Sequence, residues 1–186
     1  MRGRLILAAL VALVAAVAVG VATGAIRGTN GNDTIIGTAG PDVISALAGD
    51  DNVDAEAAND RVYAGAGNDT VRGGPGNDFV RGGSGNDVLD GQGGNDVVRG
   101  RKGDDRVNGG PGNDVLWVGS GADVESGGDG NDRLHALASD GQVDTLDCGD
   151  GNDVAVLNAT EHDVTANCER VVVRPPSARD DAEDNG

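Results

Sequence analysis

One aliphatic residue recurs every nine positions along the middle of the chain, and small or polar residues fill most of the positions between. Alternate side chains of an extended segment point to opposite faces, so a triplet with one apolar residue at its centre buries that residue alone. The pattern predicts a series of very short β-strands, each with one inward side chain. The inward positions are Ile35, Ile44, Val53, Val62, Val71, Val80, Leu89, Val98, Val107, Leu116 and Leu134. Glu125 occupies this position in the repeat VGSGADVES, and we expect it to turn outward or to weaken its turn.

An aspartate precedes each inward position by two residues, twelve times in succession without a slip. These aspartates are Asp33, Asp42, Asp51, Asp60, Asp69, Asp78, Asp87, Asp96, Asp105, Asp114, Asp123 and Asp132. Two residues before each stands a glycine in eleven repeats and Ala58 in the other, which predicts a tight turn because glycine reaches φ values closed to most side chains. Each repeat is therefore a turn followed by a short strand, and stacked repeats predict an all-β solenoid.

Composition leaves little for a conventional core, since the 186 residues include 33 glycines but only one Trp, one Tyr and one Phe. High glycine content and a formal net charge of -17 are also typical of disordered chains, and the strict periodicity is what favours a fold. The charge argues against nucleic acid or an anionic membrane as a partner and for cations.

The aspartates indicate which cation. Stacking at strand spacing places successive carboxylates about 5 Å apart along each edge. Two carboxylates at this distance repel each other by roughly 3 to 4 kcal/mol at an effective dielectric constant of about 20. Hard oxygen ligands, without His, Cys or Met at repeating positions, favour several Ca²⁺ ions over zinc or copper, and flexible loops favour calcium over magnesium. The alternative is a metal-free solenoid whose Asp and Asn side chains only cap turns.

The stretches GGPGNDFVR, GGSGNDVLD, GGPGNDVLW and GGDGNDRLH resemble the RTX (haemolysin-type) calcium-binding nonapeptide. The resemblance covers Gly28 to His135, with an outlying copy, CGDGNDVAV, at residues 148–156. It implies a right-handed parallel β-roll with two repeats per turn and with calcium held between turns by aspartate carboxylates and glycine carbonyls. The implied ligands are the twelve aspartates, Asp153, and the glycines Gly67, Gly76, Gly85, Gly94, Gly103, Gly112 and Gly130. In the first repeats Thr29, Thr38, Leu47 and Glu56 replace the second glycine, so the resemblance is looser there.

The two ends of the chain differ from the repeats. Residues 1–25 combine two arginines with an apolar run from Leu5 to Ala22, which predicts a secretory signal peptide, with an uncleaved anchor as the alternative. Residues 26–135 form the predicted calcium-binding roll. Residues 136–174 break the nine-residue spacing by three residues and predict an irregular last turn and cap, joined by a disulfide between Cys148 and Cys168. Residues 175–186 predict a disordered acidic tail.

No enzyme is expected, because the chain has neither an HExxH zinc motif nor a GxSxG nucleophile motif, and evenly spaced carboxylates suit ligand duty. We expect a secreted, extracellular calcium-binding protein, with a calcium-stiffened adhesion or scaffold module for cell-wall glycan or a protein partner as the alternative. Counted from Gly28, the nine-residue repeats that hold Tyr63, Phe79 and Trp117 are all even-numbered. With two repeats per turn, even-numbered repeats share one side of the roll, which predicts one outer face for self-association or a surface partner.

Overall fold

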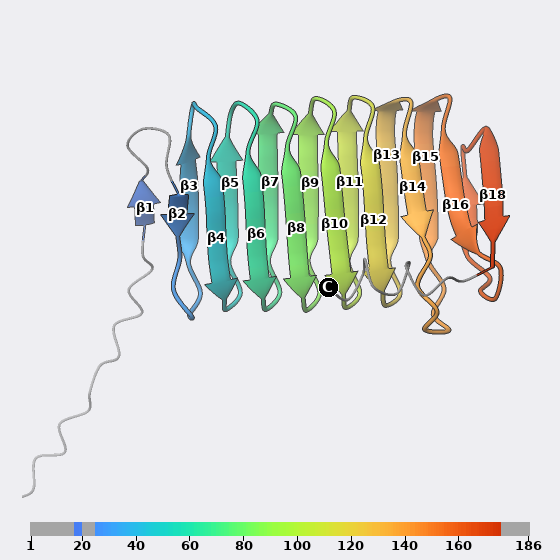
Figure 1. Ribbon diagram of the computed structural model, residues 1–186, viewed down its shortest axis with the longest axis horizontal. Coiled ribbons are helices and arrows are strands. Elements are labelled where there is room, and N and C mark those ends of the chain that lie inside the picture. Colours follow the sequence, from blue (N-terminus) through green and yellow to red (C-terminus); the bar gives the residue numbers. More distant parts are fainter. Residues whose placement is uncertain (1–16, 20–24, 176–186) are drawn as a thin grey trace, which may run out of the picture.

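The computed structural model describes residues 17–19 and 25–175, and its regular elements are strands arranged in two parallel sheets (Figure 1). The odd-strand sheet contains, in spatial order, β1 (Val17–Val19), β3 (Thr34–Thr38), β5 (Asn52–Glu56), β7 (Thr70–Pro75), β9 (Val88–Gly93), β11 (Arg106–Pro111), β13 (Val124–Gly130), β15 (Thr145–Gly151) and β17 (Val164–Ala166). The even-strand sheet contains β2 (Ala25–Arg27), β4 (Val43–Ala48), β6 (Arg61–Ala66), β8 (Phe79–Ser84), β10 (Val97–Lys102), β12 (Val115–Ser120), β14 (Arg133–Ala136), β16 (Val154–Asn158) and β18 (Arg170–Arg174). Within the described ranges no helix is long and apolar enough to cross a membrane.

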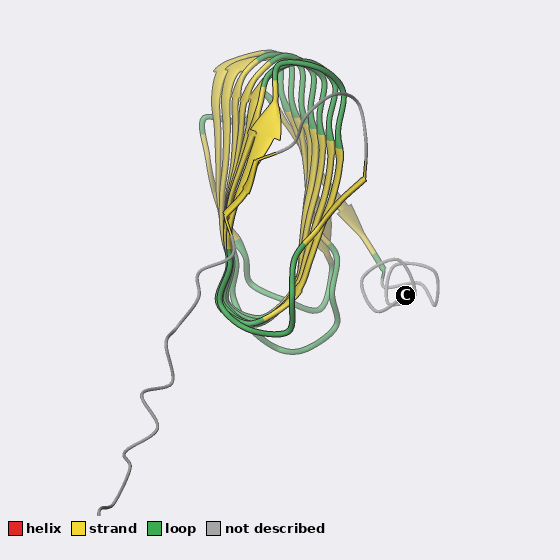
Figure 2. Cartoon of the chain, turned by 90° about the vertical axis from the view of Figure 1, so that its left-hand side faces the viewer, coloured by secondary structure: helices red, strands yellow, loops and turns green. Residues whose placement is uncertain are grey.

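Neighbouring strands within each sheet lie one solenoid turn apart. Val98 of β10 pairs with Val80 of β8 and with Leu116 of β12, so a turn of the regular region takes 18 residues and supplies one strand to each sheet. Seen along its axis, the chain follows a flattened oval with the two sheets as its long walls (Figure 2). The predicted all-β parallel roll with two repeats per turn is therefore confirmed.

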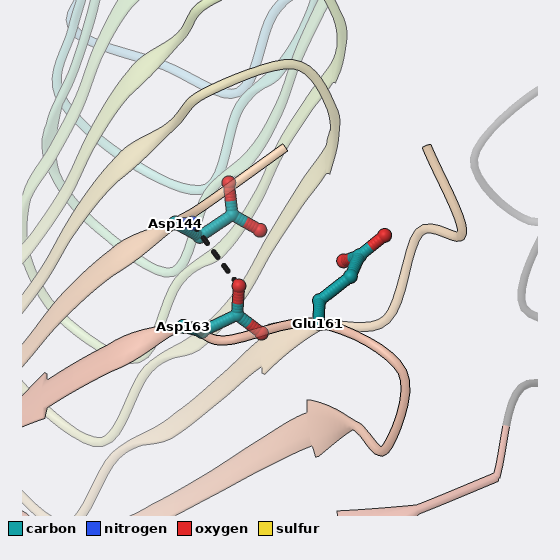
Figure 3. Close-up of side chains that lie close together, drawn as sticks. All are labelled: Asp144, Glu161 and Asp163. Atoms are coloured by element: carbon teal, nitrogen blue, oxygen red, sulfur yellow. Dashed lines mark hydrogen bonds between the residues drawn. The ribbon is translucent and has the colours of Figure 1, made fainter. Parts of the chain in front are cut away.

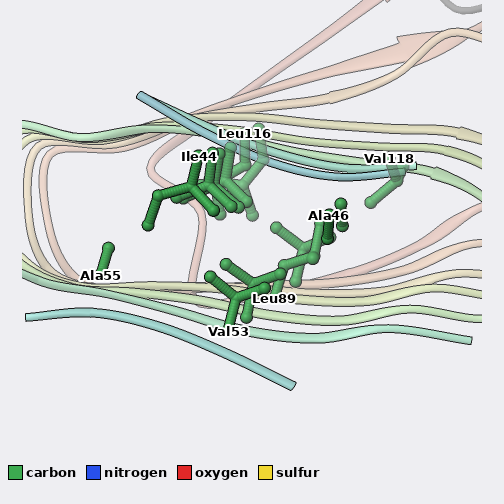
Figure 4. Close-up of a cluster of buried hydrophobic side chains, with 14 of the residues drawn as sticks. Ile44, Ala46, Val53, Ala55, Leu89, Leu116 and Val118 are labelled. Atoms are coloured by element: carbon green, nitrogen blue, oxygen red, sulfur yellow. The ribbon is translucent and has the colours of Figure 1, made fainter. Parts of the chain in front are cut away.

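The interior is a double ladder of apolar side chains. Ile44 and Leu116 lie on the even-strand wall, and Val53 and Leu89 lie on the opposite wall (Figure 4). All the predicted inward aliphatics are at most 1 % exposed. Two residues further along each strand a second inward position holds a small residue in most turns, such as Ala46 or Gly82. Each strand consequently contributes one large aliphatic side chain to the core in most turns.

Glycines at the turns allow consecutive coils to stack in contact. A Cβ added to Gly67, whose φ is +133°, would collide with the carbonyl group of Gly49 one turn earlier. Ala58 holds the same place in its repeat with a φ of 87°, a left-handed conformation that costs a non-glycine residue about 1 to 2 kcal/mol. The predicted tight turns are thus present, and their glycines serve close stacking as well as backbone freedom.

The segment after residue 135 continues the solenoid further than the sequence indicated. The three extra residues enlarge the loop between β14 and β15, and β15 then resumes the register, with Thr145 opposite Val124. Strands β15 to β18 extend both sheets, so residues 136–174 hold regular turns as well as a loop. Cys148 on β15 forms the predicted disulfide with Cys168, which closes a loop worth about 3 kcal/mol in chain entropy.

The predicted signal peptide and acidic tail lie largely outside the described residues. Of residues 1–25 the structure describes only β1, which pairs with β3, and Ala25 at the start of β2. Of residues 175–186 it describes Pro175 alone. The predictions for these two segments stay predictions.

Candidate metal centre

The repeated aspartates form a hydrogen-bonded ladder along each edge of the solenoid. The backbone amide of each aspartate donates to Oδ1 of the aspartate one turn later, as Asp78 does to Asp96 at 2.8 Å and Asp96 to Asp114 at 2.7 Å. The side chains are buried beside the turns, with 1 to 4 % of each aspartate from Asp33 to Asp132 exposed. From Asp51 onward, each carboxylate is therefore held in place through Oδ1 by the turn before it.

A second ladder runs in the opposite sense. The residue before each aspartate is most often asparagine, and its side-chain oxygen accepts from the backbone amide one turn later, as Asn68 does from Asn86 at 2.8 Å. On the other edge Asn77 accepts in the same way from Asn95 at 2.7 Å. Adjacent turns are consequently bound in both directions, because the aspartates reach back one turn and the asparagines reach forward one turn.

The second carboxylate oxygen, Oδ2, lacks a hydrogen-bond donor in most of the described repeats. Within the described residues no hydrogen-bond donor reaches the buried Oδ2 atoms of Asp51, Asp60, Asp69, Asp78, Asp87, Asp96, Asp105, Asp114, Asp132 and Asp153. A buried carboxylate oxygen without a donor is costly unless a proton or a cation satisfies it. The ten atoms thus form two rows of unmet negative charge between the turns.

A glycine faces this oxygen in the central repeats. A Cβ on Gly73 would lie 2.6 Å from Oδ2 of Asp78 and 2.8 Å from the carbonyl oxygen of Gly91 on the next turn. The absence of a side chain therefore leaves a space that a carboxylate oxygen and a carbonyl oxygen both border. Carboxylates and backbone carbonyls are the ligands that Ca²⁺ takes in proteins, in flexible geometries.

Six repeats share this open arrangement. The glycine and aspartate pairs are Gly73 with Asp78, Gly82 with Asp87, Gly91 with Asp96, Gly100 with Asp105, Gly109 with Asp114, and Gly127 with Asp132. Sequence reasoning missed these first glycines of the GGxGxD repeat and chose the third glycines instead. The pair of adjacent glycines that begins repeats such as GGPGND could have indicated this role, because a tight turn alone does not require two glycines in succession. The proposal that the third glycines are also ligands stays a prediction.

In other repeats a threonine donates a hydrogen bond to Oδ2, or a side chain fills the space beside it. The Thr38 hydroxyl donates to Oδ2 of Asp42 at 2.9 Å, and the Thr29 hydroxyl donates to Oδ2 of Asp33 at 3.0 Å. The place of the facing glycine is taken in four repeats by a residue with a side chain. These residues are Ala46, Ala55, Ala64 and Val118, which precede Asp51, Asp60, Asp69 and Asp123. The structure therefore divides the predicted carboxylate ligands into three environments that the repeat pattern does not separate.

Burial raises the pKa of the ladder carboxyls. Burial is the largest cause, neighbouring carboxylates such as Asp87 raise the pKa of Asp105 further, and the hydrogen bond from the Asp87 amide opposes them, which leaves the pKa of Asp105 at about 8. The same balance places the pKa of Asp87 and of Asp114 at about 7, and that of Asp60 at about 6. Without a cation, Asp105 keeps its proton at neutral pH and Asp87 and Asp114 keep theirs in part, so a cation competes with a proton at each of these three.

The ladders continue past the repeats that the sequence identified. Oδ1 of Asp144 accepts from the amide of Asp123 at 2.9 Å, so Asp144 is a ladder member that the nine-residue count passed over. Its own amide donates to Oδ1 of Asp163 at 3.1 Å (Figure 3). With Glu161, these two residues form a group whose oxygens lie within 4.8 Å of one another and could hold a metal ion. The signal for Asp144 was present, since Leu146 follows it by two positions, as an aliphatic residue does in every nonapeptide repeat except that of Glu125.

Glu125 points inward and does not turn outward as one expectation held. It is 1 % exposed, and within the described residues neither carboxylate oxygen has a hydrogen bond of good geometry. Burial first, and then the charge of Asp144, raise its pKa well above the ordinary value for glutamate. A buried carboxyl with a raised pKa therefore occupies a core position between Val107 and Leu146, which is unfavourable for that turn.

Parallel turns with rows of buried carboxylates facing glycine-lined spaces define the class of calcium-binding β-solenoids. Residues 27–62, 56–89 and 90–125 match the family described as the RTX calcium-binding nonapeptide repeat (4 copies), and the chain belongs to this family. Calcium binding follows from that membership together with the fold. A search of curated proteins finds no match to the chain.

Proposed function

We propose that this chain is a secreted calcium-binding protein in which several ions bind between stacked turns and drive folding outside the cell. In this proposal residues 1–25 direct export, residues 26–135 carry the calcium sites, and residues 136–174 close the far end. Calcium in the extracellular space is abundant enough for weak sites of the kind that flexible loops make.

One observation carries the proposal: no donor among the described residues reaches six buried Oδ2 atoms, and each of these atoms faces a space that a glycine leaves open. A divalent ion there would be held by the aspartate and by carbonyl oxygens such as those of Gly91 and Gly109. The same ion would remove the repulsion between carboxylates along the ladder. Because the space lies between turns, the site does not exist in the unfolded chain, and binding free energy becomes folding free energy.

The test uses the chain without residues 1–25, examined by circular dichroism and small-angle scattering in chelator and in calcium. We expect little β signal in chelator, a cooperative gain of β signal with compaction in calcium, and a much smaller response to magnesium at the same concentration. Calorimetry should count about six strong sites, one for each open glycine and aspartate pair. Identical spectra in chelator and calcium would overturn the proposal.

The carboxylates in the described repeats are better suited to this role than to catalysis. Along each ladder the carboxylates share one hydrogen-bond pattern, and burial raises the pKa of neighbours such as Asp87 and Asp105 in the same direction, whereas an acid and base pair needs two environments that separate the two pKa values. A calcium-stiffened adhesion or scaffold module uses the same ions. The charge distribution of the even-strand sheet favours a binding role of that kind.

A further inference from the structure

The two sheets of this acidic solenoid carry opposite charge. The described residues include eleven lysines and arginines, and nine of them lie on strands of the even-strand sheet: Arg27, Arg61, Arg81, Arg99, Arg101, Lys102, Arg133, Arg170 and Arg174. The strands of that sheet contain no aspartate or glutamate. Strands of the odd-strand sheet carry two arginines, Arg72 and Arg106, together with seven acidic residues. One wall is therefore cationic on a chain whose net charge is -17.

The predicted sharing of one face by the three aromatic residues is confirmed, but the face is not a simple apolar patch. Arg99 lies 5.8 Å from the ring centre of Phe79 and 5.7 Å from that of Trp117. Tyr63 packs against Phe79, with their ring centres 5.8 Å apart. Large exposed aliphatic residues lie on both sheets, such as Val88 on β9 and Val171 on β18. The even-strand sheet combines guanidinium groups with aromatic rings along its length.

Two hollows on this sheet gather its cations. A pocket of about 310 Å³ is lined by Tyr63, Arg81, Arg101 and Lys102 above the backbone of Gly65 and Gly83. A second pocket, of about 220 Å³, is lined by Arg133, Arg170 and Arg174 together with His135 and valines. By contrast, a pocket on the odd-strand sheet is lined by Asp90, Gln92 and Asn108 with no cation. Each hollow on the cationic wall is thus lined by three positive side chains.

We propose that the outer face of the even-strand sheet binds an acidic polysaccharide. Two cationic hollows on one flat wall suit a polymer that presents carboxylate or sulfate groups at intervals, and arginine pairs well with both. In the first hollow glycine backbone forms the floor and Tyr63 forms one wall, which suits the face of a sugar ring. The inference goes beyond calcium binding but needs the calcium-folded solenoid, because the hollows exist only when the turns are stacked.

A polysaccharide fits better than single-stranded nucleic acid. Proteins that bind such strands without sequence preference stack successive bases on exposed aromatic side chains. Here Tyr63 is 36 % exposed, but Phe79 and Trp117 are half-buried and have Arg99 against their rings. The face therefore offers one open ring and many cations, which matches a chain of charged sugars.

The test measures binding of the calcium-loaded protein to three polymers with one backbone: dextran sulfate, carboxymethyl-dextran and plain dextran. We expect binding to the two charged polymers, weakening as salt rises, and none to plain dextran. The double variant Arg81→Gln with Lys102→Gln should lose at least about tenfold in affinity. Tyr63→Ser should weaken binding severalfold without changing the salt dependence.

Arg72→Gln with Arg106→Gln is the matched control, since it removes the same charge from the odd-strand sheet. It should leave affinity unchanged, and circular dichroism on each sample confirms that calcium has folded the variant. Equal losses in the two double variants would overturn the proposal, because they would reduce the effect to overall charge. Binding of oligothymidylate more tightly than the charged dextrans would overturn it in favour of a nucleic-acid partner. Failure of calcium to fold the chain would instead contradict the proposed function.

Discussion

Residues 46–69 and residues 73–114 form turns of the same shape but stabilise them differently. In the first region Ala46, Ala55 and Ala64 are fully buried and supply methyl groups to the interior. In the second region glycine takes that position at Gly73 and in each of the next four repeats, and its open space borders a carboxylate oxygen. Ala64 of the first region lies in register with Gly82 of the second, since Gly65 pairs with Gly83.

The difference shows how a single methyl group changes the source of stability. A buried alanine contributes apolar contact whether or not an ion is present, whereas a glycine at the same place contributes nothing until an ion fills the space. Ahead of both regions, the Thr29 and Thr38 hydroxyl groups donate to Oδ2 of Asp33 and Asp42. The described chain thus passes from turns in which a side chain contacts or fills the space beside Oδ2 to turns in which a glycine leaves that space open to an ion.

The pH dependence of the metal-free chain gives the largest expected effect. The pKa of Asp105 is about 8 in the folded chain, against 3.8 for an ordinary aspartate, so the folded chain keeps a proton that the unfolded chain releases. Stability without metal is therefore greatest in acid and falls as pH rises from about 4 to about 8. In chelator we expect β structure near pH 5 that is lost by pH 8 and restored there by calcium.

Hydrogen exchange during this titration separates the two regions. Residues 73–114 should lose protection before residues 46–69, since the pKa of Asp60 rises only to about 6. Metal-free unfolding that does not depend on pH would show that the ladder carboxyls are not buried as described.

Removing one carboxylate should matter in the central region and not at the first repeat. Asp87→Asn should remove one calcium ion and weaken binding of its neighbours severalfold, because Asp87 has turns on both sides and no donor in the described part of the chain reaches its Oδ2. Asp33→Asn should leave the number of ions unchanged, because Thr29 already satisfies that side chain. Calorimetric titration with calcium measures both, and equal losses would mean that the threonine does not replace an ion.

Exchanging the facing residue tests the comparison directly. Gly91→Ala should remove one ion, because the added Cβ would lie 2.5 Å from Oδ2 of Asp96 and 2.8 Å from the Gly109 carbonyl oxygen. Ala55→Gly should add one ion beside Asp60 while lowering metal-free stability by about 0.5 to 1 kcal/mol. Calorimetry counts the bound ions in each variant. An unchanged count in both would mean that the residue at the glycine position does not control ion binding.

A smaller effect is expected from the buried acid. Glu125→Val should raise the free energy of unfolding in calcium by about 2 kcal/mol, because it replaces an unsatisfied carboxyl with the side chain typical of that position. Glu125→Gln keeps a buried polar group and should give no such gain. Denaturant unfolding measures both variants, and a destabilised valine variant would mean that the carboxyl has a partner in solution.

The sequence predicted the fold well because the repeat is local. A strict spacing of Asp87, Asp96 and Asp105 determines both where each strand lies and which residues become neighbours one turn later. The inward aliphatics and the disulfide followed from the same kind of pattern, and Glu125 was recognised as an exception, although its burial was not foreseen.

The individual ion sites could not be derived in this way, because they depend on which atom faces which across a turn. Asp69 and Asp78 look alike in the repeat, yet Ala64 precedes the first and Gly73 the second, and only stacking shows that this residue faces the carboxylate. Asp144 was missed because the longer loop shifted the count while the backbone pairing stayed in register.

The length of one turn also limits how such a chain can grow or shrink during evolution. Removing 18 residues takes out one strand from each wall and leaves both aspartate ladders continuous. Val80 would then pair with Leu116 in place of Val98, because all three residues hold the same position in successive turns. Removing nine would transfer every later strand to the opposite wall, and Arg99 and Trp117 would then lie among the acidic residues. A gene for this protein can therefore gain or lose whole coils freely, while half a coil would mix its cationic and acidic walls.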